Sequence, residues 1–396
     1  MPNPTSSGRT TVKPCIACGG QVSVIKSLST LIPCVVSDCR PWMAGRMIGQ
    51  CEQCGLTQRA TTGSHEAETG EMYADYEMYS HSSGSGDQKS FLDGAGRGRT
   101  AHILDFLKEH ATSPNTAILD VGSGSGSGLA AIAAAFPKVP LDGLEPFDDP
   151  SSRAGNNIDS LRTVHRGWDS VSGPYDLITM FHVFEHVPDP LPALERARNH
   201  LSDSGTLLIQ VPYFPDNPFD LLVADHISHY RCIDIDSLLR KAGFTPLEIR
   251  TDVVRKEITA IATTATSSSE SGAEAEKRVG PDDEAAKSLV PAQIEWLTLV
   301  HQHIESSLQE SGGSLGVYGT GPVGAWISAI AGENVAFFID DDEDRQGSTF
   351  HKRPIFAHAN APVETPVYLG FVPEIAEKVR KKWSDDKRRF FSPPAP

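Results

Sequence analysis

The sequence predicts an α/β protein built on a doubly wound parallel sheet. From about residue 100, short apolar runs alternate with helical stretches, which is the pattern of βαβ units. A glycine-rich turn at residues 122–126 follows a buried run and precedes an alanine-rich helix at 129–136. A second strand, glycine-rich turn and helix begin at residue 315, so we expect a second, Rossmann-like unit near the C-terminus.

Length, composition and charge exclude several classes of protein. A chain of 396 residues is long enough for two or three domains, and 39% hydrophobic residues exclude wholesale disorder. No apolar run approaches the roughly 18 residues of a membrane span, and no signal peptide is visible, so a cytoplasmic location is expected. A net charge of −16 disfavours nucleic acids and anionic membranes as partners.

The cysteines are concentrated near the N-terminus, where six of the seven lie within the first 54 residues. Four of them form two CxxC pairs, each followed by glycine: Cys15 and Cys18, then Cys51 and Cys54. Two such turns present four thiolates to one tetrahedral zinc ion. A redox dithiol and disulfides are the alternatives, but paired turns without a secretory signal favour structural zinc. Cys34 and Cys39 have the wrong spacing and are interpreted as ordinary small residues.

The middle of the chain carries the residue types of a nucleotide site. The glycine-rich turn lets the backbone approach a ligand, although such turns are shared by many nucleotide binders. The next predicted strand ends at Glu145, whose carboxylate can accept hydrogen bonds from both hydroxyls of a ribose. Trp168 and Asp169 follow where an adenine could stack, and simple packing of the tryptophan is an equal alternative.

A polar cluster follows the buried run at 205–212 and includes Asp225 and His226. In a doubly wound sheet, the loops beyond the C-terminal ends of the strands face the ligand crevice. Because imidazole titrates near neutrality and a carboxylate can orient it, this pair is a candidate general base. The alternative is that the pair only begins the turn before a helix at 235–242.

Four motifs, in this order, resemble class I S-adenosylmethionine-dependent methyltransferases. They are LDVGSGSG at 119–126, the acid at the end of the second strand, YDLITMFHVFEHVPDP at 175–190 and GTLLIQVP at 205–212. The resemblance covers roughly residues 98–250 and implies the class I methyltransferase doubly wound sheet. It also implies a set of cofactor-binding residues: Asp120, Gly122, Ser123 and Gly124 at the methionine end, Glu145 at the ribose, Trp168 and Asp169 at the adenine, and Phe181 and His182 at the floor.

The last unit contains the turn GTGPVG at 319–324 and a strand that ends at Asp340. This pattern fits a dinucleotide turn. The unit is short, however, and lacks a visible partner for hydride transfer. We therefore favour a small docking domain over an NAD site.

The order of the whole chain resembles the nucleotide-sugar C-methyltransferases of deoxysugar biosynthesis. The expected parts are a zinc-binding module at 1–70, a Tyr/Ser/His lid at 71–97, the methyltransferase domain at 98–255, an acidic linker or solvated helix at 256–290, and the C-terminal Rossmann-like domain at 291–396. The resemblance implies that His226, oriented by Asp225, abstracts a proton, and that His186 and Tyr79 hold the carbonyl or the sugar hydroxyls. Val223 stands where that family has a functional tyrosine.

The resemblance implies methyl transfer to a small molecule, a nucleotide-linked sugar, at a carbon beside a ketone through an enolate. S-adenosyl-L-methionine and structural Zn²⁺ are the expected cofactors. Two alternatives remain open. One is an O-methyltransferase of a glycan or secondary metabolite, in which His226 deprotonates a hydroxyl. The other is a non-catalytic, zinc-bearing assembly protein.

Overall fold

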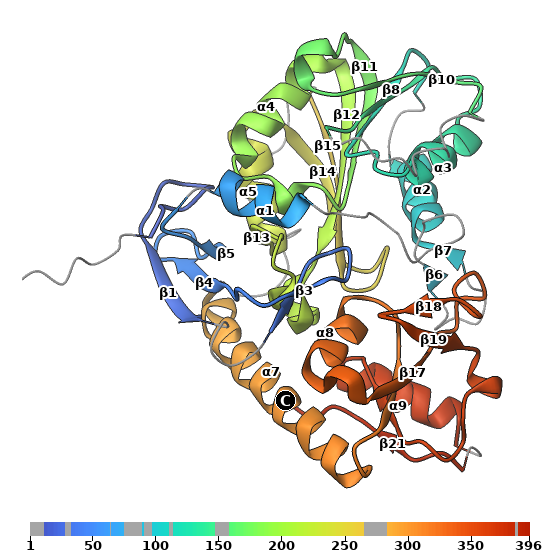
Figure 1. Cartoon of the computed structure of the whole chain (residues 1–396). Helices are drawn as coiled ribbons and strands as arrows, with labels where there is room; N and C mark the ends of the chain where they lie inside the picture. The colour runs from blue at the N-terminus through green and yellow to red at the C-terminus, as the bar shows by residue number, and fades with distance from the viewer. Residues whose placement is uncertain are drawn as a thin grey trace, which may run out of the picture.

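The computed structural model describes residues 12–27, 33–63, 65–74, 89–90, 97–110, 114–146, 158–264, 283–384 and 387–396. Figure 1 shows a module of N-terminal strands (blue), a central twisted sheet covered by helices (cyan to yellow) and a C-terminal domain (orange to red). No helix among the described residues is long and apolar enough to cross a membrane.

Seven strands form the central sheet in the order β10-β9-β8-β11-β12-β15-β14. Their bounds are β8 (Ile118–Val121), β9 (Leu141–Leu144), β10 (Leu161–His165), β11 (Tyr175–Phe181), β12 (Leu201–Pro212), β14 (Thr245–Arg250) and β15 (Glu257–Thr263). The first five are parallel, and β15 runs antiparallel to both of its neighbours. The strand order reverses at β8, which places a ligand crevice beyond its C-terminal end.

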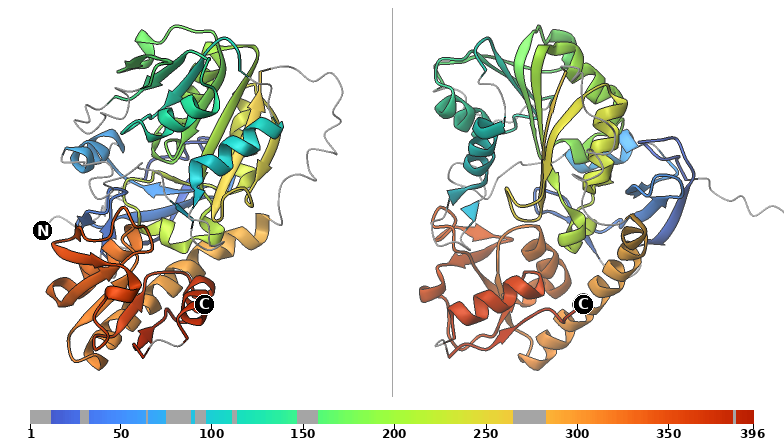
Figure 2. Two further views of the ribbon diagram at one scale, coloured as in Figure 1. Left: turned by 90° about the vertical axis from the view of Figure 1, so that its right-hand side faces the viewer. Right: turned by 180° about the vertical axis from the view of Figure 1, so that it is seen from behind.

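Helices cover both faces of this sheet, as Figures 1 and 2 show. They are α2 (Arg99–His110) and α3 (Ser127–Ala135) on one face, and α4 (Pro190–His200) and α5 (Cys232–Lys241) on the other. Alternate residues of β11 serve the two faces, because Leu177 packs in the core beneath α2 and Ile178 in the core beneath α4 and α5. The predicted doubly wound α/β arrangement is thereby confirmed.

The segment expected as a linker at 256–290 differs from the prediction at both ends. Residues 257–263 form strand β15, buried between β12 and β14, so the central sheet continues beyond the expected boundary at residue 255. The long helix α7 (Asp283–Glu310) begins within the expected linker. This helix contacts β1 of the N-terminal module and α8 of the C-terminal domain (Figure 1). The run EITAIAT at 257–263 is apolar and rich in β-branched residues, which fits a strand. The acidic residues near 283 favoured a linker, but they also suit the first turn of a helix.

The N-terminal module is an antiparallel sheet completed by a strand from elsewhere in the chain. Its order is β1 (Val22–Ser27), β4 (Met47–Cys51), β5 (Thr57–Ala60) and β13 (Ser228–His229). Ser228 pairs with Gln58 and His229 with Thr57. Smaller elements of the module are β2 (Cys34–Val35), β3 (Pro41–Trp42) and α1 (His65–Tyr73). β6 (Lys89–Ser90) and β7 (Arg97–Gly98) form a separate two-stranded sheet near α2 (Figure 1). The module is therefore joined to the loop that follows β12.

The C-terminal domain is a six-stranded sheet in the order β18-β19-β17-β16-β20-β21. Its elements are β16 (Leu315–Tyr318), α8 (Pro322–Ala331), β17 (Val335–Ile339), β18 (Thr349–Phe350), β19 (Arg353–Phe356), β20 (Val367–Leu369), α9 (Pro373–Lys382) and β21 (Phe390–Phe391). All pairings are parallel except that of β18 with β19. The strand–turn–helix unit expected from residue 315 onward is confirmed.

Gly324 is the glycine of the 319–324 turn that has no room for a side chain. A Cβ on Gly324 would lie 2.1 Å from the carbonyl oxygen of Gly319, whereas a Cβ on Gly321 would meet nothing within 4 Å. We expect Gly324→Ala to lower the free energy of unfolding by about 1–3 kcal/mol, because the helix must move off the turn. Gly321→Ala is the matched control and should unfold at the wild-type urea concentration. Equal midpoints for the two variants would contradict this packing argument.

Candidate functional site

The four cysteines of the two CxxC turns converge in the N-terminal module. The Sγ atoms of Cys15 and Cys54 are 3.6 Å apart, those of Cys18 and Cys51 are 3.5 Å apart, and all four lie within 4.8 Å of one another. Sulfurs placed about 2.3 Å from a tetrahedral zinc ion would be about 3.8 Å apart. The donor set and its geometry therefore fit Zn²⁺, whose presence stays a prediction.

The remaining N-terminal cysteines do not belong to this group. Cys34 is buried in β2, and burial raises the pKa of its thiol to about 11. Burial also raises the pKa of the Cys39 thiol, to about 12. Both thiols are therefore neutral at physiological pH, as expected for packing residues.

The glycine-rich turn between β8 and α3 forms a cradle at the end of the central strand. Gly122, Gly124 and Gly126 have φ values of 69°, 49° and 88°, a region that favours glycine. A Cβ on Gly122 would lie 2.1 Å from a methyl carbon of Val183. The Ser123 hydroxyl is buried and has no hydrogen-bond partner among the described residues. This combination of open backbone and an unpaired hydroxyl is suited to a small polar ligand.

Two buried carboxyl groups face this cradle. Glu145 is 5% exposed, and its carboxylate accepts a hydrogen bond from the backbone N–H of Gly124 at 3.0 Å. Asp120 accepts one from the Thr179 hydroxyl at 2.6 Å. Burial raises the pKa of Asp120 to about 7, against the effect of the threonine hydrogen bond, and the charge of Glu145 adds to the rise. A cationic ligand beside these acids would lower their pKa and be stabilised by them.

The other predicted cofactor residues belong to two segments, the turn after β10 and the end of β11. Trp168 and Asp169 belong to η2 (Trp168–Ser170), which follows β10; Asp169 is exposed, and the Trp168 ring packs against that of His200 at a centroid distance of 5.3 Å. Phe181 is the last residue of β11, and His182 follows it with φ of 53°. Their roles toward an adenine or a methionine group stay predictions.

His182 is held between two carboxylates. Its Nδ1 lies 3.1 Å from a carboxylate oxygen of Glu185, and its Nε2 lies 3.1 Å from one of Glu257. Burial and the charge of Arg99 lower the pKa of His182, but the two carboxylates outweigh them and raise it to about 9. His182 is therefore an imidazolium at neutral pH that donates both of its N–H groups, and it is not available as a base.

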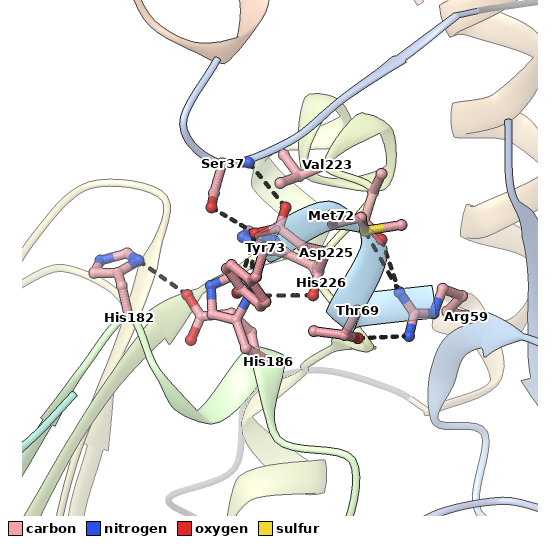
Figure 3. A network of polar contacts seen from close by, with 12 residues as sticks. Ser37, Arg59, Thr69, Met72, Tyr73, His182, His186, Val223, Asp225 and His226 are labelled. Carbon is pink, nitrogen blue, oxygen red and sulfur yellow. Dashed lines mark hydrogen bonds and ion pairs between the residues drawn. The ribbon is translucent and has the colours of Figure 1, made fainter. Parts of the chain in front are cut away.

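Figure 3 shows the polar network around Asp225. Its carboxylate accepts hydrogen bonds from the backbone N–H of Ser37 at 2.8 Å, the Ser37 hydroxyl at 2.5 Å and the Tyr73 hydroxyl at 3.3 Å. His186 approaches the same residue, with Nδ1 3.5 Å from a carboxylate oxygen and 3.1 Å from the backbone carbonyl. Asp225 therefore interacts directly with Nδ1 of His186, through both its carboxylate and its backbone carbonyl.

The expected pairing of Asp225 with His226 is wrong. The Nδ1 of His226 lies 2.7 Å from a carboxylate oxygen of Asp220, in η5 (Pro218–Leu222), six residues earlier in the chain. Adjacent side chains in an irregular loop project in different directions, so neighbours in sequence need not touch. The two histidines nevertheless meet, because the rings of His186 and His226 are 4.8 Å apart and nearly perpendicular.

The two histidines differ in basicity. Burial lowers the pKa of His186 below its ordinary value. Burial also opposes the charging of His226, but the charge and hydrogen bond of Asp220 outweigh it, and the pKa of His226 is raised. Glu185 lies beside both; it is 1% exposed, and one of its carboxylate oxygens has no hydrogen-bond partner among the described residues. The site thus joins one imidazole whose pKa is lowered and one whose pKa is raised.

Tyr73 is a site residue that sequence reasoning missed. Its hydroxyl, at the end of α1, lies 3.2 Å from Nδ1 of His186 and points into the network in Figure 3. The residue selected from the sequence, Tyr79, lies outside the described residues. The signal available was the run of tyrosines at 73, 76 and 79, from which sequence spacing alone gave no means of choosing.

Two further groups bring three metal-ligand side chains together in the described part of the chain: Glu185, His186 and His226, and Asp220, His226 and His229. In the second group both carboxylate oxygens of Asp220 are hydrogen-bonded to histidine Nδ1 atoms. These internal hydrogen bonds account for the proximity. We interpret the groups as a hydrogen-bonded network.

Comparison with known proteins identifies the central domain. Residues 95–249 match a family model described as a methyltransferase domain. The chain is 30% identical over 129 residues to the trans-aconitate 2-methyltransferase of Rhizobium meliloti, covering 32% of this chain and 50% of the relative. It is 37% identical over 94 residues to the ubiquinone biosynthesis O-methyltransferase of Erwinia tasmaniensis, covering 22% and 39%. The chain thus spans half or less of the length of these curated relatives.

Among solved structures, a SAM dependent methyltransferase from Aquifex aeolicus covers 41% of this chain and 89% of its own, with 16% identity and a TM-score of 0.36. Residues 95–249 are thus similar in sequence to a methyltransferase domain, and the strands in this range belong to the doubly wound α/β sheet.

Proposed function

We propose that the protein is an S-adenosylmethionine-dependent methyltransferase that acts on a small molecule. The observation that carries this proposal is the direct connection between the glycine cradle and the histidine pair. Val183 touches Gly122 in the cradle, and its carbonyl accepts a hydrogen bond from the backbone N–H of His186 at 2.9 Å. His186, whose ring contacts that of the candidate base His226, is therefore joined to the candidate cofactor site by a single turn, η3 (Phe184–His186).

The residues of the cradle fit the expected cofactor. Gly122 and Gly124 offer close approach of backbone, Ser123 offers its unpaired hydroxyl, Glu145 would hold the ribose hydroxyls, and Asp120 would lie near the cationic methionine end. When bound, S-adenosylmethionine supplies an electrophilic methyl group on a sulfonium sulfur. The raised pKa of Asp120 supports this placement, because a cation beside it would favour its ionised form.

The chain's own chemistry is a proton transfer. In the proposed mechanism, His226 removes a proton from the substrate, and its conjugate acid is stabilised by the Asp220 carboxylate. His186 and Tyr73 are placed to hydrogen-bond a substrate oxygen, because both project into the same network. The substrate atom that loses the proton would keep the electron pair, and with this pair it could accept the methyl group that the bound cofactor would supply.

For the substrate we propose a nucleotide-linked keto sugar, methylated at the carbon beside the ketone. The support is the order of cysteine module, methyltransferase domain and Rossmann-like tail, which resembles the nucleotide-sugar C-methyltransferases. O-methylation is the second candidate, favoured by the ubiquinone biosynthesis O-methyltransferase among the relatives. Incubation with isotopically labelled S-adenosylmethionine and a panel of nucleotide keto sugars, followed by mass spectrometry, tests the class. Loss of deuterium from the sugar carbon distinguishes C-methylation from O-methylation.

The cysteine group should contain one structural zinc per chain. We expect Cys15→Ser and Cys51→Ser to lower metal content and folded yield together, because ligand binding contributes to the free energy of folding. Elemental analysis of the purified protein measures the metal. Cys232→Ser is the control and should retain wild-type zinc. Wild-type protein with well under one zinc per chain would overturn the assignment.

Glu145 should contribute to cofactor affinity. Glu145→Ala removes the acceptor for two ribose hydroxyls and is expected to weaken S-adenosylmethionine binding by about 1–3 kcal/mol in calorimetry. Glu195→Ala, an exposed acid on α4, serves as control and should bind normally. Unchanged affinity in folded Glu145→Ala would remove this residue from the site. Undetectable binding by the wild type would instead favour the non-catalytic assembly protein.

His226 should dominate the pH dependence of turnover. Its neutral form is the base, so activity rises with pH through its pKa, and Asp220 places that rise above the ordinary imidazole value. His226→Ala is expected to lower kcat by about 10²–10⁴-fold and to abolish this limb. His102→Ala, on α2, should leave the profile unchanged. A persisting limb in His226→Ala would assign the base to another residue.

A further inference from the structure

Asp220 lies at the centre of a buried chain of three polar side chains. It is 2% exposed, and its two carboxylate oxygens face the Nδ1 atoms of two histidines, one oxygen to each. The distance to Nδ1 of His226 is 2.7 Å, and the other oxygen is in close contact with Nδ1 of His229. Burial would raise the pKa of Asp220, but the two imidazoles lower it below its ordinary value. Asp220 is therefore an anion that can only accept hydrogen bonds.

Arg46 determines which ring nitrogen of His229 carries the proton. This buried residue belongs to the cysteine module, and its guanidinium lies 3.0 Å from Nε2 of His229. Burial lowers the pKa of Arg46 to about 10, so it remains charged at neutral pH. A guanidinium has no lone pair to offer, so the Nε2 of His229 must accept and its proton must sit on Nδ1. The low pKa of His229, about 4 through burial, agrees with a neutral ring.

The same reasoning assigns the proton on His226. Since the Asp220 carboxylate is an acceptor, the Nδ1 of His226 carries a hydrogen in both the neutral and the charged ring. The proton that His226 gains or loses is then always the one on Nε2. A base needs its lone pair on a known atom, and here the hydrogen-bond chain leaves that lone pair on the nitrogen directed away from Asp220.

We propose that Asp220 is a positioning residue that holds His226 as the Nδ1–H tautomer, and that Arg46 of the cysteine module secures this arrangement through His229. This inference rests on the proposed function only in taking His226 as the base. The tautomer itself is a property of the resting protein. The backbone supports the same geometry, because Arg46 also donates to the carbonyls of Val223 and His226 on either side of the turn.

The surroundings of His226 leave Asp220 as its direct hydrogen-bond partner among the described residues. Asp225 is engaged by Ser37 and Tyr73, and Glu185 by His182. The charged and titratable groups that face His226 are Asp220, His229, Asp225, Glu185, His186 and Arg46. A change at Asp220 should therefore act on the tautomer of His226 in a way that a change at Asp225 does not.

The experiment is nitrogen-15 NMR of the full-length, zinc-loaded protein with labelled histidine, recorded as a function of pH. The His226 signals are assigned by their absence from the spectrum of His226→Gln. Above its pKa, wild-type His226 should show a protonated Nδ1 and an unprotonated Nε2. A neutral His226 protonated on Nε2 would overturn the proposal, and this observation requires no other variant to fold.

Variants then identify the source of the preference. Asp220→Asn should move His226 toward a mixture of tautomers and lower its pKa, because the stabilising anion is gone. It should also lower kcat about 10²-fold or more and shift the rising limb to lower pH. Asp225→Asn is the matched control for the tautomer, which it should leave unchanged. If Asp220→Asn keeps the wild-type tautomer, another group positions His226 and the proposal fails.

The contribution of Arg46 is tested by a second pair of variants. Arg46→Lys keeps a charged donor and should preserve the His229 tautomer, whereas Arg46→Met removes the donor and should release it. Identical His229 spectra for the two would contradict the role of Arg46. If the expected tautomers are found but the protein transfers no methyl group, the proposed function fails and this inference stands. If the protein transfers methyl groups while neutral His226 is protonated on Nε2, this inference fails and the proposed function stands.

Discussion

The buried contact between the cysteine module and the loop that follows β12 is the constraint on which the site depends. Strand β13 lies in the sheet of the module, and two buried arginines of the module donate to carbonyls of the loop. Arg46 reaches His226, and Arg59 reaches Ala224 at 3.2 Å. A buried guanidinium without acceptors would be costly, so the loop and the module must fold against each other.

This constraint links the cysteine turns to the chemistry at a distance. The turn that contains Cys51 and Cys54 connects β4 to β5, and Arg46 and Arg59 lie at the outer ends of this hairpin. The guanidinium of Arg231 also donates to the backbone carbonyl of Cys54 at 3.0 Å. If the proposed zinc ion binds the two CxxC turns, it would help to hold strands β4 and β5 in place. The arginines of this hairpin would then be held in position to orient the loop that contains His226.

The site also separates its charges into three zones. Asp120 and Glu145 make the cradle acidic, which suits a cationic cofactor. His182 is an imidazolium hydrogen-bonded to Glu185 and Glu257, and its raised pKa keeps it positively charged near neutral pH. The third zone contains two further histidines, each beside its own carboxylate. His186 lies beside Asp225, and His226 lies beside Asp220. The two imidazoles, whose rings are 4.8 Å apart, therefore differ in basicity: burial lowers the pKa of His186, whereas Asp220 raises the pKa of His226 against the effect of burial.

The sequence alone determined the features that depend on local spacing. Apolar runs predicted the strands, the glycine-rich turn placed the cradle, and the two CxxC pairs predicted the cysteine group, because such patterns act within one strand or turn. Only the tertiary structure decided that Asp220 rather than Asp225 partners His226, that Tyr73 enters the site, and that β15 completes the central sheet. The physical reason is that side-chain directions in the irregular segment at 213–231 follow no period. They are set by packing against a module that lies about 170 residues earlier in the chain.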